Sequence, residues 1–95
     1  MARRIRFFFE WGHDWPLWES FTEKYTMEPS DYGLSEELTE MLRASYRTWI
    51  DHCDPFHGWD RPESEARWRH QSDQALAVLR REVQGVADVV DERRR

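Results

Sequence analysis

The apolar positions near the start of the chain alternate with other positions, as they do along a β-strand. In residues 4–11, R-I-R-F-F-F-E-W, one face carries only large apolar side chains: Ile5, Phe7, Phe9 and Trp11. The opposite face is mainly charged. A two-residue period predicts a strand with one buried face, and Gly12 is expected to end it.

Two later stretches repeat apolar residues at steps of three and four, which is the period of an amphipathic helix. The first helix is predicted to begin after the N-cap Ser35 and to end near His52, because Pro55 cannot continue it. Its apolar stripe is Leu34, Leu38, Met41, Leu42, Trp49 and Cys53. The second helix is predicted to run from Pro62 to a stop at Gly85. Its stripe is Trp68, Ser72, Ala75, Leu76, Leu79 and Val83.

The remaining segments complete an α+β fold in the order β-α-α-β. Residues 12–33 are expected to form an irregular aromatic segment, residues 54–61 a loop, and residues 86–91 a second strand. The predicted architecture is a small sheet of the N- and C-terminal strands, covered by a two-helix hairpin. A two-stranded sheet is marginal alone, so either the aromatic segment or a second copy of the chain is expected to extend it.

Composition sets the class of protein. The 95 residues predict a single domain, 1–95, with residues 1–3 and 93–95 frayed. Aromatic residues make up 15% and charged residues 35%, which predicts an aromatic core under a charged shell. The net charge of −5 disfavours direct binding of nucleic acid, and no apolar run is long enough for a membrane span. The single cysteine, Cys53, excludes an internal disulfide and favours a cytoplasmic location.

Tryptophans and carboxylates are concentrated in residues 10–19, E-W-G-H-D-W-P-L-W-E. Tryptophan is enriched among interface hot spots because it buries a large area at little cost in conformational entropy. One reading is therefore a partner-binding surface with tryptophan anchors and an acidic rim. Its candidate residues are Trp11, Asp14, Trp15, Trp18 and Glu19. The alternative is that these rings only cap the open end of the core.

The first predicted helix also carries an acidic strip, Glu36, Glu37 and Glu40. Such a strip is usually a solvated face, and the first two carboxylates suit the positive end of the helix dipole. It could also steer a partner protein with a basic surface toward this chain.

A third candidate is the loop D-H-C-D-P-F-H, where His52, Cys53 and His57 offer imidazole and thiolate groups. These groups bind zinc, but a structural site needs four ligands, usually as spaced pairs, and no such pairs occur here. A Cys–His nucleophile would need an oxyanion hole, and no glycine-rich segment lies beside it. We therefore expect no cofactor and no catalysis, and keep a metal or small-ligand site around this loop and Trp59 as an alternative.

Several short sequence blocks, spread along most of the chain, resemble blocks shared by one family of bacterial proteins. They are R-F-F-F-E-W-G, P-L-W-E, Y-G-L-S-E-E-L, the W-I-D…W-D loop and V-V-D-E. They are similar to an uncharacterised family of small acidic proteins of actinomycete-type bacteria. The loop I-D-H-C-D-P-F-H-G-W-D departs from that family's shorter pattern. The resemblance implies one cytoplasmic bacterial domain and carries over no catalytic residue.

The leading hypothesis from the sequence is a non-catalytic protein-binding module. Small size, an acidic surface and clustered tryptophans suit an inhibitor, immunity or adaptor protein of a bacterium or its phage. The first alternative is the small-ligand or metal module around the His52–Cys53–His57 loop. The second alternative is a structural subunit that dimerises through its sheet.

Overall fold

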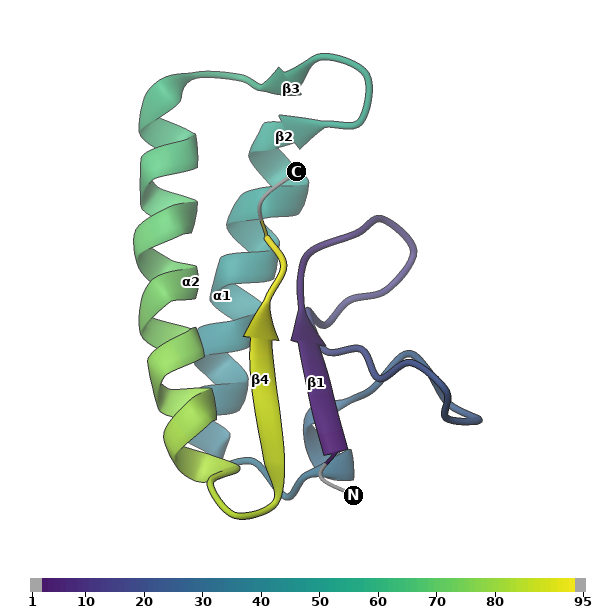
Figure 1. Cartoon of the computed structure of the whole chain (residues 1–95). Helices are drawn as coiled ribbons and strands as arrows, with labels where there is room; N and C mark the ends of the chain where they lie inside the picture. Colours follow the sequence, from purple (N-terminus) through teal and green to yellow (C-terminus); the bar gives the residue numbers. More distant parts are fainter. Residues whose placement is uncertain (1–2, 94–95) are drawn as a thin grey trace.

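The computed structural model describes residues 3–93 and has an α+β fold in the predicted order (Figure 1). Strand β1 (Arg3–Phe7) pairs in parallel with β4 (Ala87–Asp91), so the N- and C-terminal strands pair directly. Helices α1 (Glu36–His52) and α2 (Pro62–Glu82) lie side by side behind this sheet. The predicted sheet covered by a helix hairpin is confirmed.

The helices begin where their capping residues predict. The Ser35 hydroxyl accepts a hydrogen bond of 3.0 Å from the Leu38 backbone N–H, which caps α1. Glu82, at the end of α2, accepts a bond of 2.9 Å from the Ser35 backbone N–H. The end of one helix is thereby tied to the start of the other, and Pro62 occupies the first turn of α2.

The connection between the helices is more ordered than the loop predicted for residues 54–61. Strands β2 (Cys53–Asp54) and β3 (Gly58–Trp59) form a minimal antiparallel hairpin. One Asp54 carboxylate oxygen accepts bonds from the backbone N–H groups of Phe56 (2.7 Å) and His57 (3.0 Å), which closes the turn.

The first strand is shorter than the predicted 4–11, because β4 pairs only as far as Asp91, which lies opposite Phe7. On the edge of β1 that does not face β4, the aromatic segment extends the sheet. Bridges link Arg6 to Trp18 and Trp18 to Thr26, both antiparallel. A 3₁₀ turn, η1 (Pro29–Asp31), follows. Of the two expected ways to complete the sheet, this segment supplies one.

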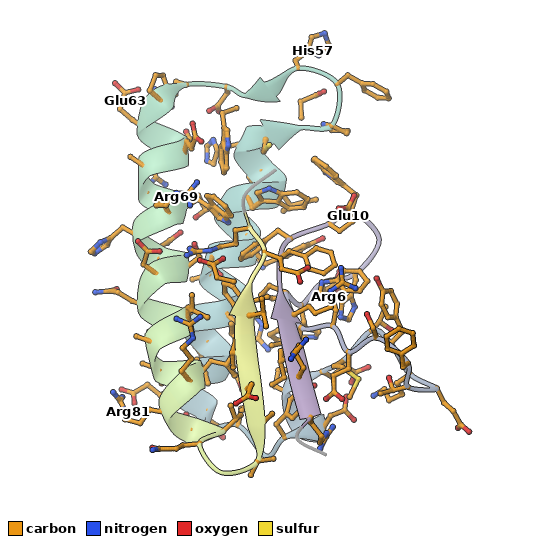
Figure 2. The ribbon with its side chains drawn as sticks, in the orientation of Figure 1. Arg6, Glu10, His57, Glu63, Arg69 and Arg81 are labelled. Atoms are coloured by element: carbon orange, nitrogen blue, oxygen red, sulfur yellow. The ribbon has the colours of Figure 1, made fainter. Side chains whose placement is uncertain are left out.

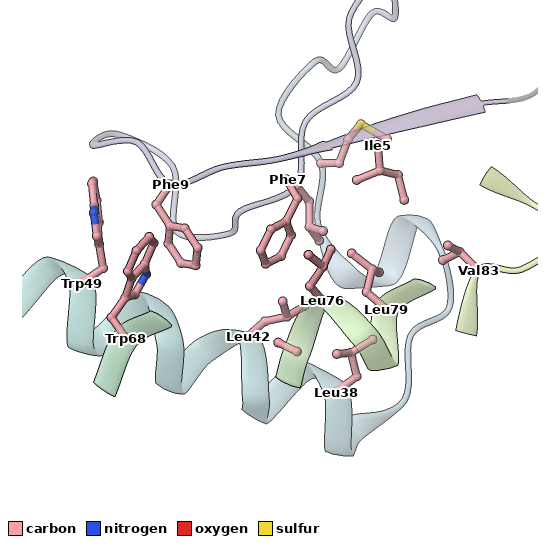
Figure 3. Close-up of a cluster of buried hydrophobic side chains, with 13 residues drawn as sticks. Ile5, Phe7, Phe9, Leu38, Leu42, Trp49, Trp68, Leu76, Leu79 and Val83 are labelled. Carbon is pink, nitrogen blue, oxygen red and sulfur yellow. The ribbon is translucent and has the colours of Figure 1, made fainter. Parts of the chain in front are cut away.

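The core lies between the sheet and the helices (Figure 3). Its members come from β1, the aromatic segment and both helices: Ile5, Phe7, Phe9, Leu17, Met27, Leu38, Leu42, Trp49, Trp68, Ala75, Leu76, Leu79 and Val83. On the far face of the sheet, Phe8 stacks on Trp18 with ring centroids 4.7 Å apart. The Trp18 indole N–H donates to the Phe8 carbonyl at 3.0 Å, so this aromatic pair is buried and satisfied.

Residues 3 and 93, at the ends expected to fray, make side-chain contacts, and residues 1–2 and 94–95 lie outside the described part of the chain, so fraying stays a prediction. Arg3 donates to the buried carboxylate of Glu19 at 2.8 Å. Arg93 has a side chain only 4% exposed and bridges Asp91 of β4 and Asp73 of α2. Such paired and hydrogen-bonded arginines stabilise both ends of the described chain. Neither helix in the described residues has an apolar stretch that could cross a bilayer.

Candidate functional site: a tryptophan-lined groove

A groove of about 570 Å³ lies near the end of the helix pair that carries the β2–β3 hairpin. We call it the tryptophan groove. It is lined by Phe9, Glu10, Trp11, Trp49, Trp59, Glu65, Trp68, Arg69 and Arg93. Figure 2 shows Glu10 and Arg69 in the half of the molecule nearer the hairpin, with Arg81 toward the other end of α2. A concave site of this size lined by aromatic and a few polar groups is typical of binding sites.

Five aromatic rings form a continuous series around the groove. Trp11 contacts Trp49 with ring centroids 4.2 Å apart. Phe9 lies 5.9 Å from Trp49 and 5.2 Å from Trp68. Trp68 is 5.4 Å from Trp59. Phe9 therefore joins the Trp11–Trp49 pair to the Trp59–Trp68 pair.

The rings meet because of the helix hairpin. Trp49 is in the last turn of α1, and Trp68 is in the second turn of α2. Antiparallel helices joined by a short connection bring such residues opposite each other. Trp59 comes from β3 in the connection itself, and Phe9 and Trp11 come from the chain that leaves β1.

Burial is graded along this series. Trp49 and Trp68 are 6% and 4% exposed and belong to the core, whereas Trp11 is 37% exposed. Trp59 is partly buried. The buried Trp68 indole nitrogen has no hydrogen-bond partner among residues 3–93. An indole N–H left without an acceptor costs about 1–3 kcal/mol, so this wall is not optimised for stability alone.

Two exposed carboxylates, Glu10 and Glu65, and one partly buried arginine, Arg69, lie on the groove. The Arg69 guanidinium is 5.2 Å from the centroid of the Trp68 ring. Arg69 therefore already makes a cation–π contact on a ring of the groove.

Arg93 lines the groove, and the charge of its guanidinium is neutralised by ion pairs with Asp91 and Asp73. It forms bonds of 2.9 and 2.7 Å with the two oxygens of Asp91, and one of 2.8 Å with Asp73. Its guanidinium also lies 5.5 Å from the Phe7 ring and donates to Ser72 at 2.6 Å. The Arg93 hydrogen bonds lower the pKa of Asp91 to about 2, although partial burial opposes the shift. Arg93 is thus a latch between β4 and α2.

A second hollow, of about 370 Å³, adjoins the groove and shares Trp11 and Trp59 with it. It contains the predicted loop residues and three further carboxylates. Its polar lining is Asp51, His52, Cys53, Asp54, His57 and Asp60. The two hollows together form a continuous aromatic and acidic surface at this end of the molecule.

The loop groups in the second hollow are engaged in local structure. His52 Nδ1 is 2.7 Å from Asp60, and His57 Nδ1 is 3.3 Å from Asp54. Burial, followed by nearby carboxylates, raises the pKa of the Cys53 thiol. A raised pKa disfavours the reactive thiolate. Across residues 3–93, no three histidine, cysteine or carboxylate side chains come together as a metal site, which weighs against the metal alternative.

The structure does not gather the predicted aromatic segment into one surface. Trp11 lines the groove, and Asp14 is exposed. Trp15 is partly buried, with the Arg43 guanidinium 5.4 Å from its ring centroid.

Trp18 and Glu19 require a correction, because they are only 6% and 3% exposed. Trp18 is sealed between Phe8 and the neighbouring strand segment. The Glu19 carboxylate is held by Arg3 and by the hydroxyl of Tyr32. Both residues are part of the folded interior, so neither is available as a contact of the free surface.

The acidic strip lies elsewhere. Glu36, Glu37 and Glu40 are exposed in the first turns of α1, whereas the groove uses its last turn. About 25 Å of helix separates the two ends of α1 at 1.5 Å per residue. Glu40 also pairs with Arg43. The strip and the tryptophan groove are therefore separate surfaces.

Reasoning from the sequence assigned most groove residues to other roles. Trp49 and Trp68 belong to the predicted helix stripes, and Glu65 is not among the predicted site residues. One available signal was their position. Both stripes place tryptophan next to the helix connection and aliphatic residues at the opposite end, and Trp59 lies between them in the sequence. In a helix hairpin, that order predicts an aromatic cluster at the connected end.

Comparison of the chain with protein-family models, with curated proteins and with solved structures found no significant match. The resemblance to the actinomycete-type group stays a prediction.

Proposed function

We propose that this protein is a non-catalytic module that binds another protein, and that the tryptophan groove is its contact surface. The observation that carries this proposal is the graded aromatic series, with buried Trp49 and Trp68 supporting the partly exposed Trp11. Hot spots of protein interfaces are large side chains held rigidly by their neighbours, and Trp11 fits that description. An inhibitor, immunity or adaptor protein of a bacterium or phage acts in this way.

The chemistry of the polar groups supports binding rather than catalysis. The Cys53 thiol has a raised pKa, and each nearby imidazole is engaged with a carboxylate. Nucleophilic catalysis by a cysteine needs a thiolate activated by a base within hydrogen-bond reach, and the raised pKa of the Cys53 thiol disfavours that state.

The test compares Trp11→Ala with Phe21→Ala in pull-downs from a lysate of the source organism. Phe21 is a fully exposed aromatic residue that does not line the groove, so it controls for general loss of apolar surface. We expect a stoichiometric partner that is lost with Trp11→Ala and kept with Phe21→Ala, with both variants folded by circular dichroism. Equal retention by both variants contradicts the groove as the contact surface.

A second candidate function is binding of a small ligand in the second hollow. It is favoured by the enclosure of His52, Cys53 and Trp59 in one hollow of about 370 Å³. Such a ligand would raise the melting temperature of the purified protein, because binding to the folded state alone stabilises it. His57→Ala should reduce that shift, and elemental analysis of the same sample tests for a bound metal.

Dimerisation through the sheet is less favoured. The Glu92 N–H donates to the Phe7 carbonyl, so the alternate residue Val89 directs its backbone groups to the outer edge of β4. There the Arg80 guanidinium donates to the Val89 carbonyl at 3.1 Å. A charged side chain on an edge strand opposes edge-to-edge pairing. Measurement of mass in solution against concentration tests this.

A further inference from the structure

Building on the proposed function, we infer that the tryptophan groove receives a basic side chain of the partner, arginine in preference to lysine. The partner is accordingly a protein with an exposed basic segment. Charge, ring geometry and size each support this assignment.

The first support is charge. Among the described residues that line the two adjoining hollows, two are arginines and five are carboxylates: Glu10, Asp51, Asp54, Asp60 and Glu65. Arg93 is already neutralised by Asp91 and Asp73. The C-terminal end of α1, with its partial negative charge, reaches the second hollow at His52. The surface therefore attracts a cation and disfavours an anion.

The second support is the ring arrangement. A cation within about 6 Å of an indole ring centre is attracted by the negative face of the ring. The groove brings four indole rings around one hollow. The chain's own guanidinium groups already lie at such distances, with Arg69 at 5.2 Å and Arg93 at 6.0 Å from the Trp68 ring. An incoming guanidinium has the partly exposed Trp11 and Trp59 as further rings.

The third support is size. A hollow of about 570 Å³ is within the usual range of about 300–1,000 Å³ for sites that hold extended organic groups. It accommodates a long side chain together with neighbouring backbone. The second hollow continues past Trp11 and Trp59, so a segment with two basic residues can use both.

Arginine suits the groove better than lysine for two reasons. Its planar guanidinium stacks on indole rings and is more weakly hydrated than an ammonium group. Its several N–H donors also suit carboxylate acceptors, and Glu10 and Glu65 line the same groove as the rings.

The experiment titrates the full-length protein with acetyl-Gly-Arg-Gly-Arg-Gly-amide and follows tryptophan fluorescence. Matched peptides carry lysine or citrulline in place of arginine, and citrulline keeps the shape of arginine without its charge. We expect the arginine peptide to bind at least about tenfold more tightly than the citrulline peptide, with lysine between them, and to weaken as salt rises. Equal binding of arginine and citrulline peptides overturns the inference.

Two glutamates in the first turns of α2 give a matched pair of variants. Glu65 lines the groove, and Glu63 is exposed and does not line it. Both suit the helix dipole equally, so their effects on folding should be alike. We expect Glu65→Gln to weaken binding of the arginine peptide by about three- to tenfold. Glu63→Gln should leave the affinity for that peptide unchanged. Equal effects of the two variants count against the groove as the cation site.

The two proposals fail separately. If the arginine peptide does not bind but Trp11→Ala still abolishes capture of the partner, the basic side chain is wrong and the protein-binding function stands. If the peptide binds and responds to Glu65→Gln, but partner capture is indifferent to Trp11→Ala, the cation site stands and the proposed protein contact falls.

Discussion

The two ends of the helix pair are built from different side chains. At the end remote from the hairpin, Ile5, Leu38, Leu79 and Val83 are at most 1% exposed. At the hairpin end, tryptophan rings replace these aliphatic groups, and Trp11 remains 37% exposed beside a groove of about 570 Å³. Figure 3 shows the aliphatic cluster and the Phe9–Trp49–Trp68 cluster at opposite ends of one core.

The difference is the basis for proposing that the two ends have separate roles, one in stability and one in binding. Branched aliphatic side chains interlock and fill the space between helices and sheet. At the other end, large flat rings meet at interplanar angles of 40° in Trp11–Trp49 and 43° in Trp59–Trp68. The aliphatic end is therefore fully closed, whereas the tryptophan end leaves the Trp11 ring partly accessible, as the proposed contact with a partner requires.

The largest expected effect distinguishes the two ends directly. Leu38→Ala removes a fully buried side chain, and we expect the free energy of unfolding to fall by about 3 kcal/mol. Trp11→Ala removes a partly exposed ring, and we expect a loss of about 1–2 kcal/mol. Urea unfolding followed by circular dichroism measures both. A larger loss for Trp11→Ala would show that the tryptophan end is the main source of stability.

Arg93 links the groove to the rest of the fold, so its replacement tests how independent the two ends are. Arg93→Gln leaves Asp91 and Asp73 without their shared cation, and we expect a loss of about 2–3 kcal/mol. Arg93→Lys keeps the charge but not the two-pronged geometry, so it should recover only part of the stability. Urea midpoints of the three proteins decide this, and a silent Arg93→Gln contradicts the latch.

The same latch predicts an acid dependence. The pKa of Asp91 is lowered to about 2 in the folded protein from an ordinary value of 3.8. Its contribution is therefore complete above about pH 4 and is lost as the pH falls through about 2. Because the Asp91 side chain is 29% exposed, solvent screening reduces its contribution to the free energy of unfolding to about 1–2 kcal/mol.

Unfolding by urea at pH 5 and pH 2.5 measures that contribution. Asp91→Asn should lose less stability between these pH values than the unchanged protein does. Asp88→Asn changes an exposed residue on the same strand and serves as the control. Its loss of stability between pH 5 and pH 2.5 should equal that of the unchanged protein. If Asp91→Asn loses as much stability between these pH values as the unchanged protein, the acid sensitivity arises elsewhere.

The helices and the fold class could be predicted because they depend on local patterns. The steps of three and four, the Ser35 cap and Pro62 fix both helices without reference to distant residues. The end of the first strand could not be predicted in this way. Phe7 is the last residue of β1 because its partner strand ends at Asp91, which is 84 positions away in the sequence.

The candidate site depended even more on distant contacts. Trp11, Trp15 and Trp18 were candidates for one surface, yet of these three only Trp11 lines the groove. Trp18 is buried because its backbone bridges to Arg6 and Thr26, which local periodicity does not reveal. The groove itself collects residues from the chain after β1, both helices, β3 and the chain after β4. No single stretch of sequence contains enough of it to predict the site.

The smallest expected effect comes from a region that belongs to neither end. Phe21 is fully exposed and has a backbone φ of +65°, a left-handed conformation that is strained for a bulky side chain. Asparagine tolerates this conformation, and Phe21 has no buried contacts to lose. We expect Phe21→Asn to raise the free energy of unfolding by a few tenths to about 1 kcal/mol. Phe56→Asn replaces another exposed phenylalanine that lacks a positive φ, so it should give no gain. If thermal unfolding gives the same change in free energy for both variants, the loss of exposed apolar surface explains it. The left-handed backbone of Phe21 would then contribute no strain that the substitution relieves.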